Sequence, residues 1–176
     1  MTDTDRSIDR VAETIAEVLE KKKYSIDYYQ REYKWETKQL AELVADLTAS
    51  FLKLYEPGHA RKDVGKYQGY FLGSIIISQK GSQPFIVDGQ QRLTSLSLLL
   101  TFLRRLQHGR EDLVNIDELI YSEKFGDKSF NLDVPDRNEC MDALFENGEY
   151  EAPVDAPESV RNLIERYAEL EGLFPD

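Results

Sequence analysis

The chain has few of the residues on which cross-links and metal centres depend. Its 176 residues include one cysteine, Cys140, and two histidines, His59 and His108. A single cysteine excludes an internal disulfide and a cysteine-based zinc cluster. The two histidines are far apart in sequence and lack a plausible metal or nucleophile partner nearby, so we expect both to be solvated. We therefore expect a fold held by its hydrophobic core, with Cys140 inert on a buried helix face.

Long apolar runs are absent as well. No stretch reaches membrane-spanning length, and the N-terminus, Met1–Asp5, is acidic and unlike a signal peptide. Hydrophobic residues make up 41% of the chain and aromatic residues 11%, which is typical of a folded protein. The length fits one domain, or one domain with a helical appendage. We expect a cytoplasmic protein with no membrane partner.

Positive charge is scarce overall, and its distribution matters more than its total. The net charge of −11 at first disfavours nucleic acid as a partner. However, residues 111–176 carry 5 Lys/Arg against 19 Asp/Glu, whereas residues 20–110 carry 15 against 9. The acidic part is consistent with a solvated helical surface, and the basic part suits phosphate groups.

The hydrophobic pattern predicts short strands among amphipathic helices. The expected elements are helices over 7–22, 37–52, 90–107, 135–147 and 158–171, and strands over 24–26, 70–78 and 84–87. We expect Ile75–Ile77 to be fully buried, and the second helix to bury a stripe that ends at Phe51 and Leu52. The predicted fold class is α+β, a small mixed sheet with packed helices. We divide it into a domain over 1–110 and a helical extension over 111–176, which we expect to continue into a further C-terminal region.

The most informative segment runs from Phe85 to Leu96, where a β-branched strand stops at Asp88-Gly89 and a leucine-rich helix begins. A glycine turn before a helix leaves backbone N–H groups unpaired, which favours anion binding. Gly89 allows a positive φ and close approach to a ligand, and Arg92 can bind phosphate oxygens through its planar fork. Gln90 or Gln91 can orient a water, and Asp88 can hold Mg²⁺. The alternative is an ordinary strand–turn–helix in which Asp88 is the N-cap.

A second informative segment is the aromatic–basic run Tyr28–Trp35. Its aromatic rings can stack on bases while Arg31 and Lys34 meet phosphates. The alternative is that Tyr33 and Trp35 fix the segment to the core, and for Trp35 we favour the core. The candidate nucleic-acid contacts are Tyr29, Gln30, Arg31 and Lys34.

Three blocks in this order resemble a known family. They are Ser25–Trp35, Phe71–Ile75 and Val87–Leu96, and together they resemble the DGQQR-motif domain. That domain forms the N-terminal part of GmrSD-type modification-dependent restriction enzymes and of the phosphorothioate-sensing SspE proteins. The resemblance covers about residues 20–105. The chain departs from the family in one place, because Ile26-Asp27 stands where the family has Ile-Pro.

The resemblance implies a fold related to ParB and sulfiredoxin, with binding and hydrolysis of a nucleoside triphosphate, GTP or ATP, together with Mg²⁺. It places the catalytic residues at Asp88, Gln90, Gln91 and Arg92, with Asp88 as the metal ligand. The nucleotide-binding residues would be Gly89, Gln30 and Arg31.

The resemblance also implies partners. These are modified DNA and a nuclease domain or subunit of the HNH type, for which this chain carries no site. Oligomerisation is compatible with the sequence. We therefore expect an NTP-hydrolysing sensor module of an antiphage restriction system. The alternatives are a modified-DNA-binding module without NTPase activity, and a structural domain that meets a partner through its acidic helices.

Overall fold

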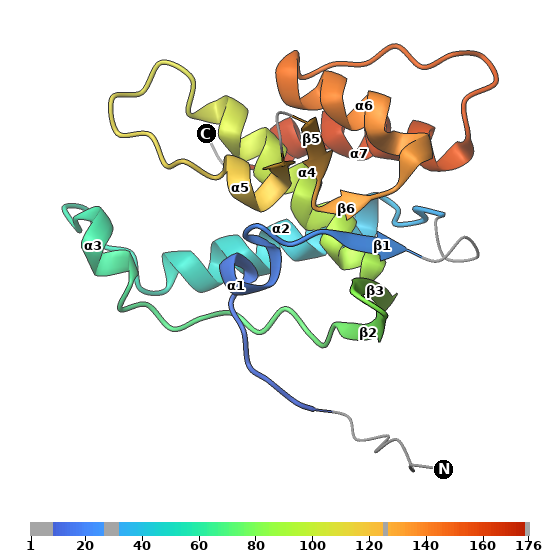
Figure 1. Ribbon diagram of the computed structural model, residues 1–176. Helices are drawn as coiled ribbons and strands as arrows, with labels where there is room; N and C mark the ends of the chain where they lie inside the picture. Colours follow the sequence, from blue (N-terminus) through green and yellow to red (C-terminus); the bar gives the residue numbers. More distant parts are fainter. Residues whose placement is uncertain (1–8, 27–31, 125–126, 175–176) are drawn as a thin grey trace, which may run out of the picture.

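The computed structural model describes residues 9–26, 32–124 and 127–174. Helices and short strands are interspersed along this part of the chain (Figure 1). The helices are α1 (Ile15–Leu19), α2 (Thr37–Leu52), α3 (Arg61–Val64), α4 (Gln90–Leu106), α5 (Asp117–Ile120), α6 (Pro135–Glu146) and α7 (Glu158–Leu173). The strands are β1 (Tyr24–Ile26), β2 (Ile76–Lys80), β3 (Gln83–Asp88), β4 (Tyr121–Lys124), β5 (Asp127–Phe130) and β6 (Leu132–Asp133). Within the described ranges, no helix has the length and apolarity to cross a bilayer.

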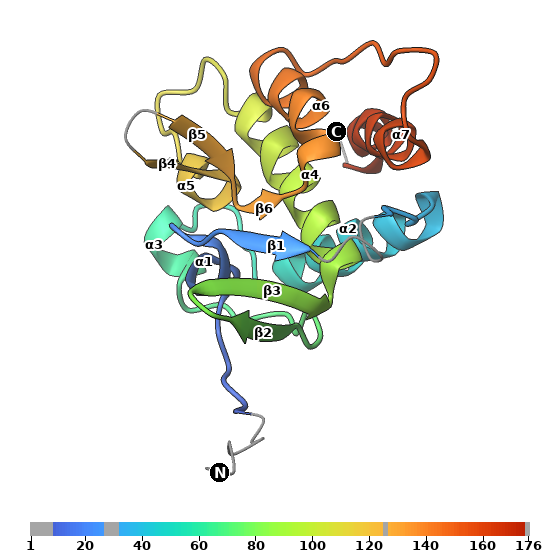
Figure 2. The same cartoon turned by 45° about the vertical axis from the view of Figure 1, so that its right-hand side comes forward.

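The main sheet is small and mixed. Its strand order is β2-β3-β1-β6, in which β2 and β3 form an antiparallel hairpin and β1 runs parallel to both β3 and β6. A separate antiparallel hairpin joins β4 to β5. Figure 2 shows the four strands of the main sheet side by side, with α4 leading away from the end of β3. The α+β class, with a small mixed sheet and packed helices, is confirmed.

Helix α4 is the centre of the hydrophobic core. Its first turns bury Leu93 and Leu96 against β1, β3 and α1, and its later turns bury Leu98 and Phe102 among α2, α6 and α7. Burying a leucine of this kind contributes roughly 1.5–3 kcal/mol. Because Leu93 and Leu96 lie in the first turns of α4, the end of the helix that follows Gly89 packs against the sheet.

The predicted domain over 1–110 and the predicted extension over 111–176 share this sheet and core. Strand β6 pairs with β1, and α7 packs on both α4 and α2. The part beyond residue 110 also contains the β4–β5 hairpin, so it is less uniformly helical than we expected.

The first helix is shorter than the periodicity predicts. Helix α1 begins at Ile15, because the Thr14 side chain accepts from the Glu17 N–H and the Glu17 carboxylate accepts from the Thr14 N–H. This capping box fixes the start of the helix. Residues 9–14 are not helical, and Val11 is 75% exposed. The predicted start at Ser7 falls outside the described residues.

Two predictions of burial are wrong. Ile76 and Ile77, which we expected in the core, are 47% and 36% exposed because β2 is the edge strand of the sheet. Phe51 and Leu52 at the end of α2 are 40% and 54% exposed, because the last turn of α2 extends beyond the helices that cover the rest of it. By contrast, the structure confirms α2, α4 and α7 nearly to the residue, whereas the strand predicted over 70–78 is shorter and shifted, with β2 spanning Ile76–Lys80.

The Cys140 thiol is expected to be unreactive until the protein unfolds. It is 1% exposed on α6, and burial raises the pKa of this thiol to about 12. The thiolate is the reactive form, so little of it exists in the folded protein below that pH. An aromatic disulfide reagent should label no thiol of the native protein at pH 8 and one thiol after denaturation. Rapid labelling of the native protein at pH 8 would contradict this burial.

Candidate functional site

The turn between β3 and α4 has the geometry that the Asp88–Arg92 motif predicts. Gly89 is the N-cap of α4 with φ of +91°, and its carbonyl accepts the first helical hydrogen bond from Leu93 N–H at 3.0 Å. Among the described residues, no side chain caps the helix. The alternative in which Asp88 is the N-cap is therefore wrong. An uncapped helix N-terminus has free N–H groups and a favourable dipole for an anion.

Gly89 is required by the loop that precedes β2. A Cβ at this position would lie 3.1 Å from Ile75 Cγ1 and 3.3 Å from the Ser74 carbonyl oxygen, closer than such atoms normally approach. The contact brings the Phe71–Ile75 block against the Asp88–Arg92 turn. Two of the three blocks that carry the family resemblance therefore meet here.

Arg92 is positioned by the same loop. Its Nη1 donates to the Ser74 carbonyl oxygen at 3.1 Å. Gly73 has φ of +98°, and a Cβ there would lie 2.9 Å from the Arg92 Cζ. The glycine thus makes room for the guanidinium, which is half-buried in the first turn of α4. Its other N–H groups can donate hydrogen bonds to an anion at the helix N-terminus.

Tyr70 belongs to the surroundings of Arg92. Its hydroxyl donates to Asp46 Oδ2 at 2.7 Å. This hydrogen bond raises the pKa of Tyr70, and the nearby Arg92 charge lowers it. The phenol therefore stays protonated beside Arg92 and ties the loop to α2.

The two glutamines of the motif have different environments. Gln91 uses both amide atoms on the aromatic–basic segment, since its Nε2 donates to the Glu32 carbonyl at 2.6 Å and its Oε1 accepts from Lys34 N–H at 2.8 Å. Gln90 Oε1 is buried with no hydrogen-bond partner among the described residues. In this arrangement Gln91 holds the segment, and Gln90 keeps an unused acceptor at the turn.

The part of the aromatic–basic segment that follows residue 31 is also held by contacts with α4 and α7. Tyr33 is fully buried, and its hydroxyl shares a 2.8 Å hydrogen bond with Ser95 of α4; burial raises the pKa of this phenol. Asn162 of α7 donates to the Tyr33 carbonyl at 2.8 Å. Trp35 packs on both core clusters, as the alternative for Tyr33 and Trp35 predicted.

Sequence reasoning missed Ser95 and Asn162 as positioning residues. Ser95 is polar and wholly buried within a run of leucines, and that polar residue in an apolar run was the available signal. Asn162 gave no comparable signal, because its role depends on where α7 packs. Both side chains are far in sequence from the segment they hold.

Asp88 offers a carboxylate at the turn, where it is exposed at the end of β3. In the part of the chain that the structure describes, no three His, Cys, Asp or Glu side chains gather as a metal site. Mg²⁺ commonly binds through one or two carboxylates together with substrate phosphates and waters. Asp88 beside a helix N-terminus fits this mode.

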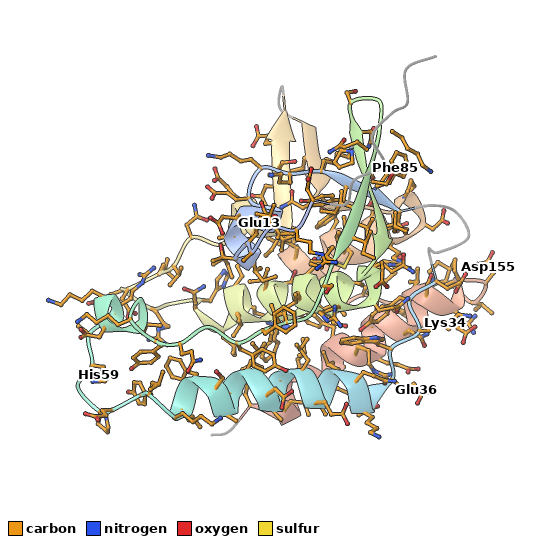
Figure 3. The ribbon with its side chains drawn as sticks, turned by 90° about the horizontal axis from the view of Figure 1, so that it is seen from below. Glu13, Lys34, Glu36, His59, Phe85 and Asp155 are labelled. Carbon is orange, nitrogen blue, oxygen red and sulfur yellow. The ribbon has the colours of Figure 1, made fainter. Side chains whose placement is uncertain are left out.

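The five consecutive predicted site residues Asp88–Arg92 lie at one turn, and the fold brings Lys34 to it. Lys34 reaches Gln91 through its backbone N–H and directs an exposed side chain outward (Figure 3). Tyr29, Gln30 and Arg31 fall outside the described residues.

Comparison with known proteins gives one finding on family. No curated protein matches the chain significantly. A family model described as GmrSD restriction endonuclease, N-terminal domain, matches residues 15–172. This range spans all three sequence blocks and extends from the start of α1 into the last turn of α7. The chain therefore belongs to the family of GmrSD restriction endonuclease N-terminal domains.

Proposed function

We propose that this restriction-endonuclease module binds a nucleoside triphosphate at the N-terminus of α4 and hydrolyses it with Mg²⁺, and so regulates a DNA-cleaving partner. The observation that carries the proposal is the uncapped helix N-terminus with Arg92 fixed beside it by Gly73 and Ser74. Helix N–H groups and an arginine fork are the usual ligands of phosphate oxygens in proteins.

Each residue of the turn has a role in this proposal. The first N–H groups of α4 and the Arg92 guanidinium bind the phosphates and stabilise the charge that develops on their oxygens. Gln90, whose Oε1 is left without a partner, would orient the attacking water, and Asp88 would hold Mg²⁺. The cation would supply further neutralisation of phosphate charge. Gln91 is a positioning residue.

Gln91 also connects the proposed nucleotide site to the segment proposed to contact DNA. Its amide bridges the first turn of α4 to Glu32 and Lys34, directly after the predicted nucleic-acid contacts Tyr29, Gln30 and Arg31. A shift of the first turn upon phosphate binding therefore moves that segment. We propose that modified DNA and nucleotide favour the same position of the Gln91 amide, so that binding of one strengthens binding of the other.

The test is release of phosphate from each of the four nucleoside triphosphates, with and without Mg²⁺ and with modified or plain duplex DNA. We expect Mg²⁺-dependent release, which Asp88→Asn lowers at least tenfold by removing the carboxylate charge while keeping its shape. Asp155→Asn, an exposed carboxylate on the α6–α7 loop, is the matched control and should leave the rate unchanged. Equal rates for both variants would remove Asp88 from the mechanism.

A second candidate function is a reader of modified DNA that does not hydrolyse nucleotide. The exposed Lys34 at the end of the aromatic–basic segment favours it. In a gel-shift comparison of modified and plain duplexes, Arg31→Ala and Lys34→Ala should then weaken binding of the modified duplex. Selective DNA binding with no phosphate release from any nucleotide would favour this function over the first.

A further inference from the structure

Phe71 is unusually exposed for an aromatic residue, and it lies in the loop that meets the turn of α4. It is 80% exposed, whereas the next most exposed phenylalanine, tyrosine or tryptophan of the described residues, Tyr55, is 43% exposed. A single exposed apolar residue is common on protein surfaces and needs no explanation by itself. The significance of Phe71 depends on how its loop is held and on what lies beside it.

The loop is fixed on both sides of Phe71. Before it, the Tyr70 hydroxyl donates to Asp46 Oδ2 at 2.7 Å, which ties the loop to α2. After it, Leu72 packs against the core cluster that contains Leu93 of α4. Because the residues on either side are anchored, the exposed ring is held at one place on the surface.

The loop places Phe71 beside Arg92. A Cβ on Gly73 would lie 2.9 Å from the Arg92 Cζ. Gly73 is two residues from Phe71, and two residues of chain span at most about 7 Å. On the other side, the Asp46 hydrogen bond raises the pKa of Tyr70, and the Arg92 charge is close enough to lower it. The ring is therefore attached within reach of a ligand that Arg92 binds.

A phenylalanine ring recognises a different part of a ligand from an arginine. It has no hydrogen-bonding group, so it cannot bind a phosphate, but its face stacks on other flat rings. Stacking on an aromatic side chain is favourable for every nucleobase, because each base has a π face. A ligand that combines phosphates with a flat ring would therefore use both Arg92 and Phe71.

We propose that Phe71 stacks on the base of the nucleoside triphosphate whose phosphates bind at Arg92 and the N-terminus of α4. This stacking rests on the proposed function, because the phosphates fix where the base lies. The ring contacts the face of the base and not its edges, so it holds ATP and GTP alike. A bare polyphosphate gains nothing from it.

The charges of the loop favour a nucleotide over a base of DNA. Proteins that stack on the bases of a nucleic-acid strand combine their aromatic rings with a positively charged groove that follows the phosphates. Residues 67–75 contain no lysine and no arginine. The cation that contacts this loop is Arg92, and one cation beside one ring matches the phosphates and base of a single nucleotide.

The test is calorimetric titration with Mg²⁺ and three ligands: the slowly cleaved β,γ-imido analogues of ATP and GTP, and inorganic tripolyphosphate, which has no base. We expect Phe71→Ala to weaken binding of both analogues about tenfold, within the usual effect of removing one stacked ring. Binding of tripolyphosphate should not change. Phe71→Trp keeps an aromatic face and should retain the affinity for both analogues. Phe71→Leu keeps an apolar side chain without a flat face and should not.

Val154→Ala is the matched control, since Val154 is 96% exposed on the α6–α7 loop, and it should change no affinity. Thermal unfolding shows that each variant is folded, and Phe71→Leu decides if Phe71→Ala is not. Equal weakening of the analogues and of tripolyphosphate would overturn the stacking, because the ring would then shape the phosphate site.

Unchanged affinity of Phe71→Ala for both analogues would also overturn it and assign the ring to another ligand, such as a base of DNA or the rest of the endonuclease. Binding of nucleotide that depends on Arg92 would in that case leave the proposed function in place. If the unsubstituted chain bound neither the analogues nor tripolyphosphate, both the proposed function and the stacking would be wrong.

Discussion

Replacing Gly89 by alanine is expected to destabilise the protein by about 2–4 kcal/mol and to abolish nucleotide binding. A side chain at φ of +91° costs roughly 1–2 kcal/mol. The new Cβ would also press on Ile75 Cγ1 at 3.1 Å and on the Ser74 carbonyl, and this overpacking adds to the cost. Relief requires the loop before β2 to move away, and that movement breaks the Arg92 hydrogen bond to Ser74. Urea unfolding and binding of a fluorescent nucleotide analogue measure the two effects.

Gly81→Ala is the matched control. Gly81 also has a positive φ, +66°, but nothing lies within 4 Å of a Cβ built there. Alanine at this hairpin turn therefore incurs the backbone cost without the collision. The difference between the two variants measures the contact between the turn and the loop. Equal destabilisation by the two variants and unchanged nucleotide binding would show that this contact contributes neither to stability nor to binding.

The elements around the site were predictable where several local signals coincide. For α4, a glycine turn precedes a leucine-rich run, and for the β2–β3 hairpin, Gly81 separates two β-branched segments. The exposure of Ile76 and Ile77 was not predictable, because their residue types indicate burial while their place at the edge follows from strand order. No local pattern encodes the pairing of β1 with β3, residues that are 60 positions apart in the register Ser25–Phe85.

The same distinction applies to the candidate site. The positive φ of Gly89 is allowed by local sequence, since glycine has no Cβ and adopts this conformation readily. The separate environments of Gln90 and Gln91 do not, because they depend on where the segment around Lys34 passes. The Gly73 contact with Arg92 likewise arises only when these two residues, 19 positions apart and in different blocks, meet in the fold. The resemblance named these blocks, and the structure explains why they occur together.

Replacing Arg92 by alanine is expected to lower the rate of nucleotide hydrolysis about 100- to 1,000-fold, the usual effect of removing one donor that stabilises developing charge. The fold should survive, because Arg92 is half-buried and its side chain makes a single hydrogen bond within the described residues, to the Ser74 carbonyl at 3.1 Å. Phosphate release at saturating nucleotide, together with a thermal unfolding curve, separates loss of chemistry from loss of structure. Arg161→Ala, an exposed arginine on α7, is the matched control.

Arg92→Lys distinguishes binding by charge from binding by a fork. A lysine keeps the positive charge but cannot donate two parallel hydrogen bonds, and it also cannot fill the space that Gly73 leaves for a planar guanidinium. We therefore expect the lysine variant to recover nucleotide affinity in part and the hydrolysis rate hardly at all. Full recovery of the rate by lysine would show that Arg92 acts only as a point charge, and then the close fit of Gly73 against the guanidinium would have no catalytic purpose. An unchanged rate in the alanine variant would remove the turn of α4 from the reaction altogether.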